Sequence, residues 1–159
     1  MNIYGITGLK NSGKTGLTER LVGEFKTRGL TVSTIKHAHH RVAIDDPGTD
    51  SDRHRTAGAS EVILSTPNGW RMMSSEAIGL NDLLSRMAPV DLVLIEGYKH
   101  AEHPKIECHR NGLGHALLAP ENRSIKAIAS DTVIQTTLPR FELDDTKAIA
   151  DFISQELGI

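Results

Sequence analysis

Residues 8–15, with the sequence Gly-Leu-Lys-Asn-Ser-Gly-Lys-Thr, constrain the fold of this chain more than any other stretch. They match the phosphate-binding pattern Gly-x-x-x-x-Gly-Lys-Ser/Thr at every specified position. A loop of this kind turns several backbone N–H groups toward one point, so that they and the helix N-terminus behind them hold phosphate oxygens. We therefore expect a nucleotide site between a buried strand and a helix.

The side chains of this loop have separate expected roles. Lys14 would reach the β- and γ-phosphates, and the hydroxyl of Thr15 would be a ligand of the accompanying Mg²⁺. Gly8 and Gly13 let the backbone approach the phosphates closely. The residues expected to bind the nucleotide are Gly8, Lys10, Asn11, Ser12, Gly13, Lys14 and Thr15.

The segments around the loop predict a parallel sheet. Residues 2–7 are rich in β-forming side chains, and residues 15–28 place apolar side chains at helical spacing. A second strand is expected over 30–35, and the apolar run over 90–97 is typical of a strand buried on both faces. We expect an α/β fold of the P-loop NTPase-like kind, with a mostly parallel sheet flanked by helices.

An inserted β-hairpin region interrupts this alternation. Asn68-Gly69 separates two β-prone runs at 61–66 and 70–73, and Asn-Gly is the strongest short hairpin signal. The apolar side chains of the second run either pack inward or cover a second copy of the chain. The other expected elements are a short helix capped by Asp50, Ser51 or Asp52 and running through Ala57, a helix over 79–87, strands over 105–109, 124–131 and 141–143, and a last helix capped by Asp144 or Asp145.

Length and composition set the broad class of the protein. With 159 residues, of which 38% are hydrophobic and 24% charged, we expect a single nucleotide-binding domain over 1–159. A formal net charge of −2 argues against nucleic-acid or membrane binding. The single cysteine, Cys108, excludes a disulfide within the chain, and no segment approaches the ~20 apolar residues of a membrane span. We expect a cytoplasmic protein.

A carboxylate directly follows the most apolar strand. Glu96 stands where a phosphate-loop fold places a second group for Mg²⁺, and an oxygen ligand suits a hard cation that bridges phosphates. The alternative is a surface carboxylate that ends a strand. We expect Glu96 to join Thr15 in the metal site, because Gly97 beside it lets a phosphate or a loop come close.

A basic cluster follows the second expected strand. It consists of Lys36, His37, His39 and His40, and α/β sheets bind their ligands at this edge. We favour anion binding, in which the lysine and the imidazoles donate to an anionic ligand. Zinc binding and a solvated surface are the alternatives.

The polar loop over 41–55 is long enough to indicate a function. Asp45, Asp50 and Asp52 are the candidates for a third carboxylate ligand of the metal, and Asp45 is the first to test. Asp50 and Arg53 are candidates for an anion- or substrate-binding loop. Each of these side chains could instead be solvated or cap a helix.

Asp131 follows a late strand, where folds of this type bind the base. A carboxylate can accept hydrogen bonds from both N1–H and the amino group of guanine and has no such partner pair on adenine, so guanine is the better match. A helix cap or a turn is the alternative role for this side chain.

Five groups of residues spread over most of the chain form a specific combination. They are 8–15, 36–40, Asp45 with 47–48 and 50–51, 53–55 with 57–59, and 92–100. Together they closely resemble the MobB family, molybdopterin-guanine dinucleotide biosynthesis protein B. The phosphate loop is shared by many proteins, whereas the histidine cluster and the Pro-Gly, Asp-Ser and Ala-Gly-Ala elements that follow it are specific.

This resemblance implies a dimeric GTP-binding protein with weak intrinsic GTPase activity that acts in molybdenum cofactor maturation. Members of the family are thought to assist a MobA-like guanylyltransferase, which attaches GMP to molybdopterin. The resemblance also implies that Gly13, Lys14 and Thr15 hold the phosphates and Mg²⁺, that Glu96 is the acid of the second nucleotide motif, and that the β-hairpin region contributes to dimerisation.

The long loop departs from the family pattern at four positions, Val42, Ala43, Thr49 and Asp52. The family pattern has a lysine where Thr49 stands, so the hold of this loop on a nucleotide or pterin phosphate is in question.

Two other functions use the same phosphate loop. One is a small-molecule kinase, in which residues 37–55 would close over an acceptor. The other is a metal-insertion GTPase, in which the histidines would carry a metal.

Overall fold

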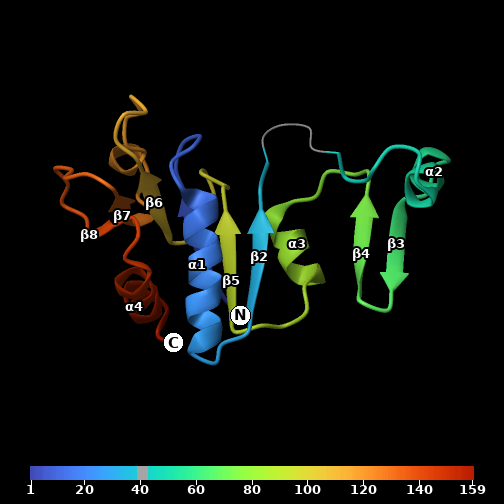
Figure 1. Ribbon diagram of the computed structural model, residues 1–159, viewed down its shortest axis with the longest axis horizontal. Helices are drawn as coiled ribbons and strands as arrows, with labels where there is room; N and C mark the ends of the chain where they lie inside the picture. The colour runs from blue at the N-terminus through green and yellow to red at the C-terminus, as the bar shows by residue number, and fades with distance from the viewer. Residues whose placement is uncertain (39–42) are drawn as a thin grey trace. The chain divides into compact units, whose positions relative to one another are not determined.

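The computed structural model describes residues 1–38 and 43–159, which group into two compact units. Met1–His37 and Pro89–Ile159 form the first unit, and Ala38–Ala88 form the second (Figure 1). Two of the predicted cluster residues, His39 and His40, lie outside the described residues, as does Val42. No helix in the described part of the chain has the length and apolar character needed to cross a membrane.

The first unit contains a six-stranded sheet in the order β2-β5-β1-β6-β7-β8, in which every pairing is parallel. Its strands are β1 Asn2–Thr7, β2 Val32–Lys36, β5 Leu92–Glu96, β6 Lys105–His109, β7 Ile125–Ser130 and β8 Arg140–Glu142. All five residues of β5 are buried, because the strand lies between β1 and β2 and both its faces are covered. The predicted mostly parallel α/β sheet is confirmed.

Helices α1 Lys14–Thr27 and α4 Thr146–Leu157 share one core with the sheet. Tyr4 of β1, Leu17 of α1 and Ile153 of α4 are fully buried in it. A short 3₁₀ helix, η1 Ala119–Glu121, lies between β6 and β7. Asp145 caps α4 through the Ala148 N–H at 3.1 Å, as one of the two predicted capping residues.

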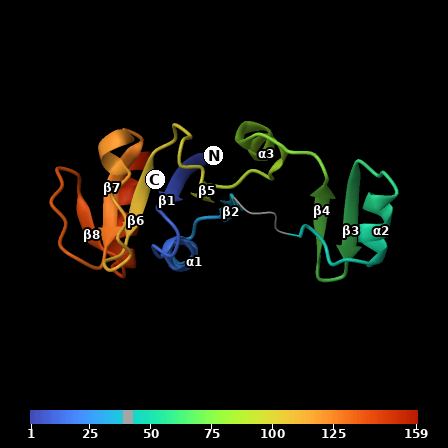
Figure 2. The ribbon, with the colours of Figure 1, turned by 90° about the horizontal axis from the view of Figure 1, so that it is seen from above.

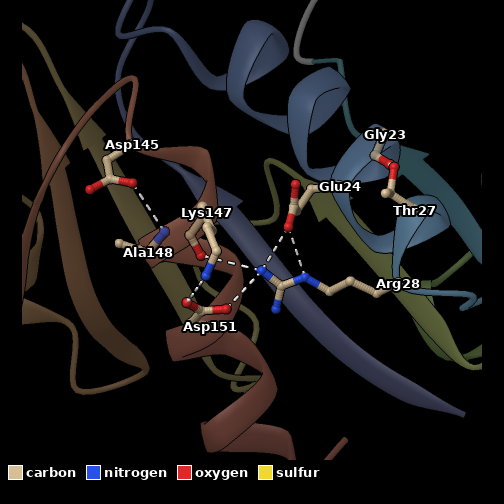
Figure 3. Close-up of polar contacts among 8 residues, drawn as sticks. All are labelled: Gly23, Glu24, Thr27, Arg28, Asp145, Lys147, Ala148 and Asp151. Atoms are coloured by element: carbon tan, nitrogen blue, oxygen red, sulfur yellow. Dashed lines mark hydrogen bonds and ion pairs between the residues drawn. The ribbon is translucent and has the colours of Figure 1, made fainter.

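One arginine joins the C-terminal end of α1 to the first half of α4 (Figure 3). The Nη2 atom of Arg28 lies 2.8 Å from Glu24 Oε1 of α1 and 2.8 Å from Asp151 Oδ1 of α4. It also donates to the Lys147 carbonyl at 3.4 Å. This bridge fixes α1, which begins at the phosphate loop, against the C-terminal helix.

The second strand begins later than the predicted range of 30–35. Gly29 has φ +86°, and the Leu30 N–H donates to the Phe25 carbonyl at 3.1 Å. Leu30 therefore belongs to the C-terminal cap of α1, and β2 begins at Val32.

The second unit consists of a β-hairpin and two short helices. The strands β3 Glu61–Thr66 and β4 Gly69–Ser74 are antiparallel, which confirms the predicted hairpin, and the helices are α2 Asp50–Thr56 and α3 Leu80–Arg86. Figure 2 shows α2 beside β3, which it contacts. The predicted caps Asp50, Ser51 and Asp52 of α2 are wrong, because Thr49 is its N-cap and accepts from the Asp52 N–H at 3.3 Å.

Candidate functional site

The phosphate loop follows β1. Two of its glycines and one asparagine have positive φ angles. Gly8, Asn11 and Gly13 have φ values of +138°, +64° and +98°. A Cβ atom on Gly8 would lie 2.4 Å from the Cys108 carbonyl oxygen and 2.5 Å from Ser12 Oγ. A side chain at position 8 therefore does not fit, because the loop packs directly against the end of β6.

The loop leads straight into α1, which has an open N-terminus. The Leu17 N–H donates to the Gly13 carbonyl at 3.0 Å, and no side chain in the described part of the protein caps the helix. The Ser12 hydroxyl is buried and has no hydrogen-bond partner among the described residues. Unpaired donors at a helix N-terminus fit a phosphate group, so the structure of this loop agrees with the predicted nucleotide site.

A threonine, a glutamate and a lysine meet beside the loop. The Thr15 hydroxyl donates to Glu96 Oε1 at 2.9 Å, although the two residues are 81 positions apart in the chain. The Lys36 ammonium lies 3.3 Å from the same carboxylate oxygen and donates to Thr15 Oγ1 at 3.2 Å. The structure brings together these three predicted residues, and the two oxygen atoms fit a hard divalent cation.

Lys14 folds back onto the loop. Its ammonium donates to the Leu9 carbonyl at 2.6 Å. Burial lowers the pKa of Lys14, and the positive charges of Lys99 and Lys36 act in the same direction, against the negative charge of Glu96. An anion beside Lys14 would relieve this concentration of positive charge.

The strand ends next to the glutamate pack closely. A Cβ atom on Gly97, which has φ +99°, would lie 3.1 Å from both Cβ and the carbonyl oxygen of His37. The His37 ring stacks on Tyr98, with 4.3 Å between ring centroids. Among residues 1–38 and 43–159, no three His, Cys, Asp or Glu side chains come together as a metal-binding group.

The predicted residues of the long loop lie in the second unit, where each has local partners. Asp45 Oδ1 accepts from Arg71 Nη2 at 2.6 Å, while its buried Oδ2 has no hydrogen-bond partner among the described residues. Asp50 and Arg53 form an exposed ion pair at 3.6 Å within α2. Thr49 caps that helix, which explains a threonine at this position. The proposed roles of Asp45, Asp50 and Arg53 in binding stay predictions.

The opposite side of the phosphate loop lies against the end of β6. Asp131 Oδ1 accepts from the Asn111 N–H at 2.8 Å, so the carboxylate shapes the turn after β6. A Cβ atom on Gly13 would lie 3.3 Å from Nε of Arg110. Neither Arg110 nor Lys99 is among the residues that the motif singles out. Arg110 directly follows β6, and Lys99 comes three residues after the end of β5. Their positions after strands of the sheet were the signal that could have found them.

The parallel sheet, the loop after its central strand and the Lys14-Thr15-Glu96 arrangement define a P-loop NTPase-like α/β protein. Residues 3–131 match the family model of MobB, molybdopterin guanine dinucleotide synthesis protein B. The chain belongs to this family, and the resemblance noted in the sequence is confirmed.

Relatives and solved structures agree with this assignment. The molybdopterin-guanine dinucleotide biosynthesis adapter protein of Escherichia coli K12 is 36% identical over 89% of this chain and 85% of its own. The adapter protein of Haemophilus influenzae is 36% identical over 98% of this chain and 89% of its own. The crystal structure of Bacillus subtilis MobB matches with a TM-score of 0.77 and 25% identity over 99% of this chain and 98% of that one.

Proposed function

We propose that this protein binds GTP with Mg²⁺ at the phosphate loop and is an accessory protein in molybdenum cofactor biosynthesis. In this role it helps a MobA-like guanylyltransferase to attach GMP to molybdopterin. Membership of the MobB family and the name shared by the relatives, molybdopterin-guanine dinucleotide biosynthesis adapter protein, support the accessory role.

The observation that carries the nucleotide site is the hydrogen bond between Thr15 and Glu96. These two side chains come from the helix after the loop and from the end of the adjacent strand β5. Two oxygen atoms held 2.9 Å apart, with the ammonium of Lys36 already beside them, make a place that favours positive charge. This is the chemistry that Mg²⁺ with a nucleoside triphosphate requires.

Each residue of the site has a definite task in this proposal. The backbone N–H groups of the loop and of the first turn of α1 bind phosphate oxygens, and Lys14 exchanges the Leu9 carbonyl for a phosphate. Thr15 and Glu96 would hold the metal, which would supply positive charge to the phosphates. Glu96 is thus engaged as a ligand rather than as a base, so we propose that hydrolysis is slow.

We propose that the protein acts in the cytoplasm as a homodimer and that the hairpin forms the interface. Cross-strand partners place Ile63, Trp70 and Met72 on one face of the hairpin, where they are 62%, 71% and 40% exposed. The opposite face buries Val62 and Met73. An apolar face that is left open on a two-stranded sheet is typical of an interaction surface.

Calorimetric titration with GTP, GDP and ATP tests the nucleotide site. The wild type binds GTP in preference to ATP, and Lys14→Ala removes binding. Glu96→Gln lowers the affinity for GTP by roughly tenfold in Mg²⁺ but not in EDTA, because it removes a charged ligand of the metal. Glu102→Gln, which changes an exposed carboxylate before β6, is the matched control.

Tight binding of ATP with no response to GTP would contradict the proposal and favour the small-molecule kinase. The accessory role is tested separately, by adding the protein to a purified guanylyltransferase with molybdopterin and GTP. The wild type increases the yield of the dinucleotide, and the Lys14→Ala variant does not.

A further inference from the structure

The phosphate loop has two sides that differ in their charged groups. Its parent strand β1 lies between β5 and β6, and in Figure 1 the loop rises between the ends of these two strands. On the β5 side, Thr15, Glu96 and Lys36 are bonded to one another. On the β6 side, the first positively charged residue after the strand is Arg110.

Arg110 lies against the last glycine of the loop. A Cβ atom on Gly13 would lie 3.3 Å from Nε and 3.6 Å from Nη2 of its guanidinium. Gly13 directly precedes α1, so the guanidinium stands beside the N–H groups at the start of that helix. A cation is unfavourable next to the positive end of a helix dipole unless an anion lies between them.

The guanidinium of Arg110 is exposed and has neither a hydrogen-bond acceptor nor a carboxylate partner among the described residues. Arg20, on the same side of α1, shows the opposite behaviour. It donates to the Leu143 carbonyl and the Thr146 hydroxyl, and it lies 3.3 Å from Asp144. Arg20 therefore has a structural role, whereas the five N–H donors of Arg110 are available to a ligand.

The turn that carries Arg110 is itself held in place. The next residue, Asn111, donates its N–H to Asp131 Oδ1 at 2.8 Å and accepts from the Gly112 N–H at 2.9 Å. The preceding residue, His109, lies 3.3 Å from the Ser130 hydroxyl. Both Ser130 and Asp131 stand at the end of β7, so the backbone on each side of Arg110 is tied to the neighbouring strand.

We propose that Arg110 binds the α-phosphate end of the nucleotide and that Asp131 positions the turn that carries it. This inference rests on the proposed nucleotide site. Thr15 and Glu96, the residues that would hold a metal beside the terminal phosphates, lie on the β5 side. The α-phosphate and the nucleoside then extend toward β6, where Arg110 stands against Gly13. A guanidinium matches phosphate oxygens in a bidentate geometry that a lysine does not reproduce.

Titration calorimetry with GTP, GDP and GMP tests this assignment on the wild type, Arg110→Ala, Arg110→Lys and Arg123→Ala. Arg110→Ala weakens GTP, GDP and GMP by a similar factor of about tenfold, because all three carry the α-phosphate and GMP carries no other. Arg110→Lys restores only part of the affinity. Arg123 is also exposed but precedes β7 at the other edge of the sheet, so Arg123→Ala makes the same change of charge without weakening the nucleotides.

Several results would overturn the inference, and each has a separate meaning. Unchanged binding of GTP and GDP in Arg110→Ala, with loss of binding in Lys14→Ala, would show that Arg110 does not bind the nucleotide. The proposed function would then stand. Loss of GTP affinity alone places the guanidinium at the γ-phosphate, and loss of GTP and GDP affinity with unchanged GMP affinity places it at the β-phosphate. An equal loss of nucleotide affinity in Arg123→Ala would show that the effect comes from the lower positive charge of the protein and not from a contact with Arg110. Absence of nucleotide binding by the wild type is instead a failure of the proposed function, and this inference falls with it.

Discussion

Gly8 shows how strongly a single residue of the phosphate loop is determined. Its φ of +138° is unfavourable for any residue with a side chain, and the space for a Cβ is taken by the Cys108 carbonyl oxygen at 2.4 Å. A methyl group there would push the start of the loop away from β6. The conformation of the loop and its contact with the sheet therefore depend on the same glycine.

We expect Gly8→Ala to lower the free energy of unfolding by on the order of 2 kcal/mol and to weaken nucleotide binding, since the loop must move. Chemical denaturation and calorimetry measure the two effects. Gly23→Ala is the control: Gly23 lies within α1 with nothing within 4 Å of the added Cβ, so this variant gains about 0.5–1 kcal/mol. A Gly8→Ala variant as stable as the wild type, with normal binding, would contradict this account.

Residues of the site were predictable where a motif fixes their spacing. Lys14 and Thr15 follow from the loop, and Glu96 from its place after an apolar strand, and the structure brings Thr15 and Glu96 into contact. Arg110 was not predicted, because its significance comes from a neighbour 97 positions earlier in the chain, Gly13. Local sequence patterns do not contain contacts of this kind.

The segment between β5 and β6 is an irregular element held by buried polar groups. Lys105 is fully buried, and its ammonium donates to the carbonyls of Ala101 and Tyr98. Asn122 donates to the Lys99 carbonyl at 2.7 Å. The ring of His103 lies against Gly5, and its Nε2 has no hydrogen-bond partner among the described residues. These contacts fix the residues that follow Glu96.

We expect this segment to make the fold sensitive to acid. Burial, together with the nearby charge of Lys105, lowers the pKa of His103 from 6.5 to about 4. Between these values the unfolded chain binds a proton that the folded chain does not, so stability decreases as the pH falls from 6.5 toward 4. Urea denaturation at pH 7 and pH 5 measures the loss, which His103→Gln reduces. The same loss in that variant would assign the effect to other groups.

Elements were predictable from pattern, while their ends and caps were not. The hairpin over β3 and β4 follows from Asn68-Gly69, and β5 from its run of apolar residues. The start of β2 and the cap of α2 depend instead on which donor reaches which carbonyl or hydroxyl. Leu30 completes the C-terminal end of α1. Thr49 is the N-cap of α2, where one of the three residues after it was expected to be the cap.

At the scale of the whole molecule, the apolar face of the hairpin predicts self-association. We expect the wild type to sediment as a dimer, and Ile63→Ser with Trp70→Ser to weaken the dimer by at least roughly tenfold, because large buried side chains dominate interfaces. Analytical ultracentrifugation over a range of concentrations measures this. Asn68→Ser, in the turn of the same hairpin, is the control. A monomeric wild type, or a double variant that dimerises normally, would exclude this face as the interface.

The position of the single cysteine makes the closure of the sheet edge measurable. Cys108 is 1% exposed, and burial raises the pKa of its thiol to about 12. Its backbone carbonyl lies against Gly8, so β6 and the phosphate loop separate only when this edge opens. A thiol in this environment reacts with an alkylating reagent only in the opened form. The rate of alkylation in native protein thus reports how often the nucleotide site comes apart, and a ligand that holds the loop against β6 slows it.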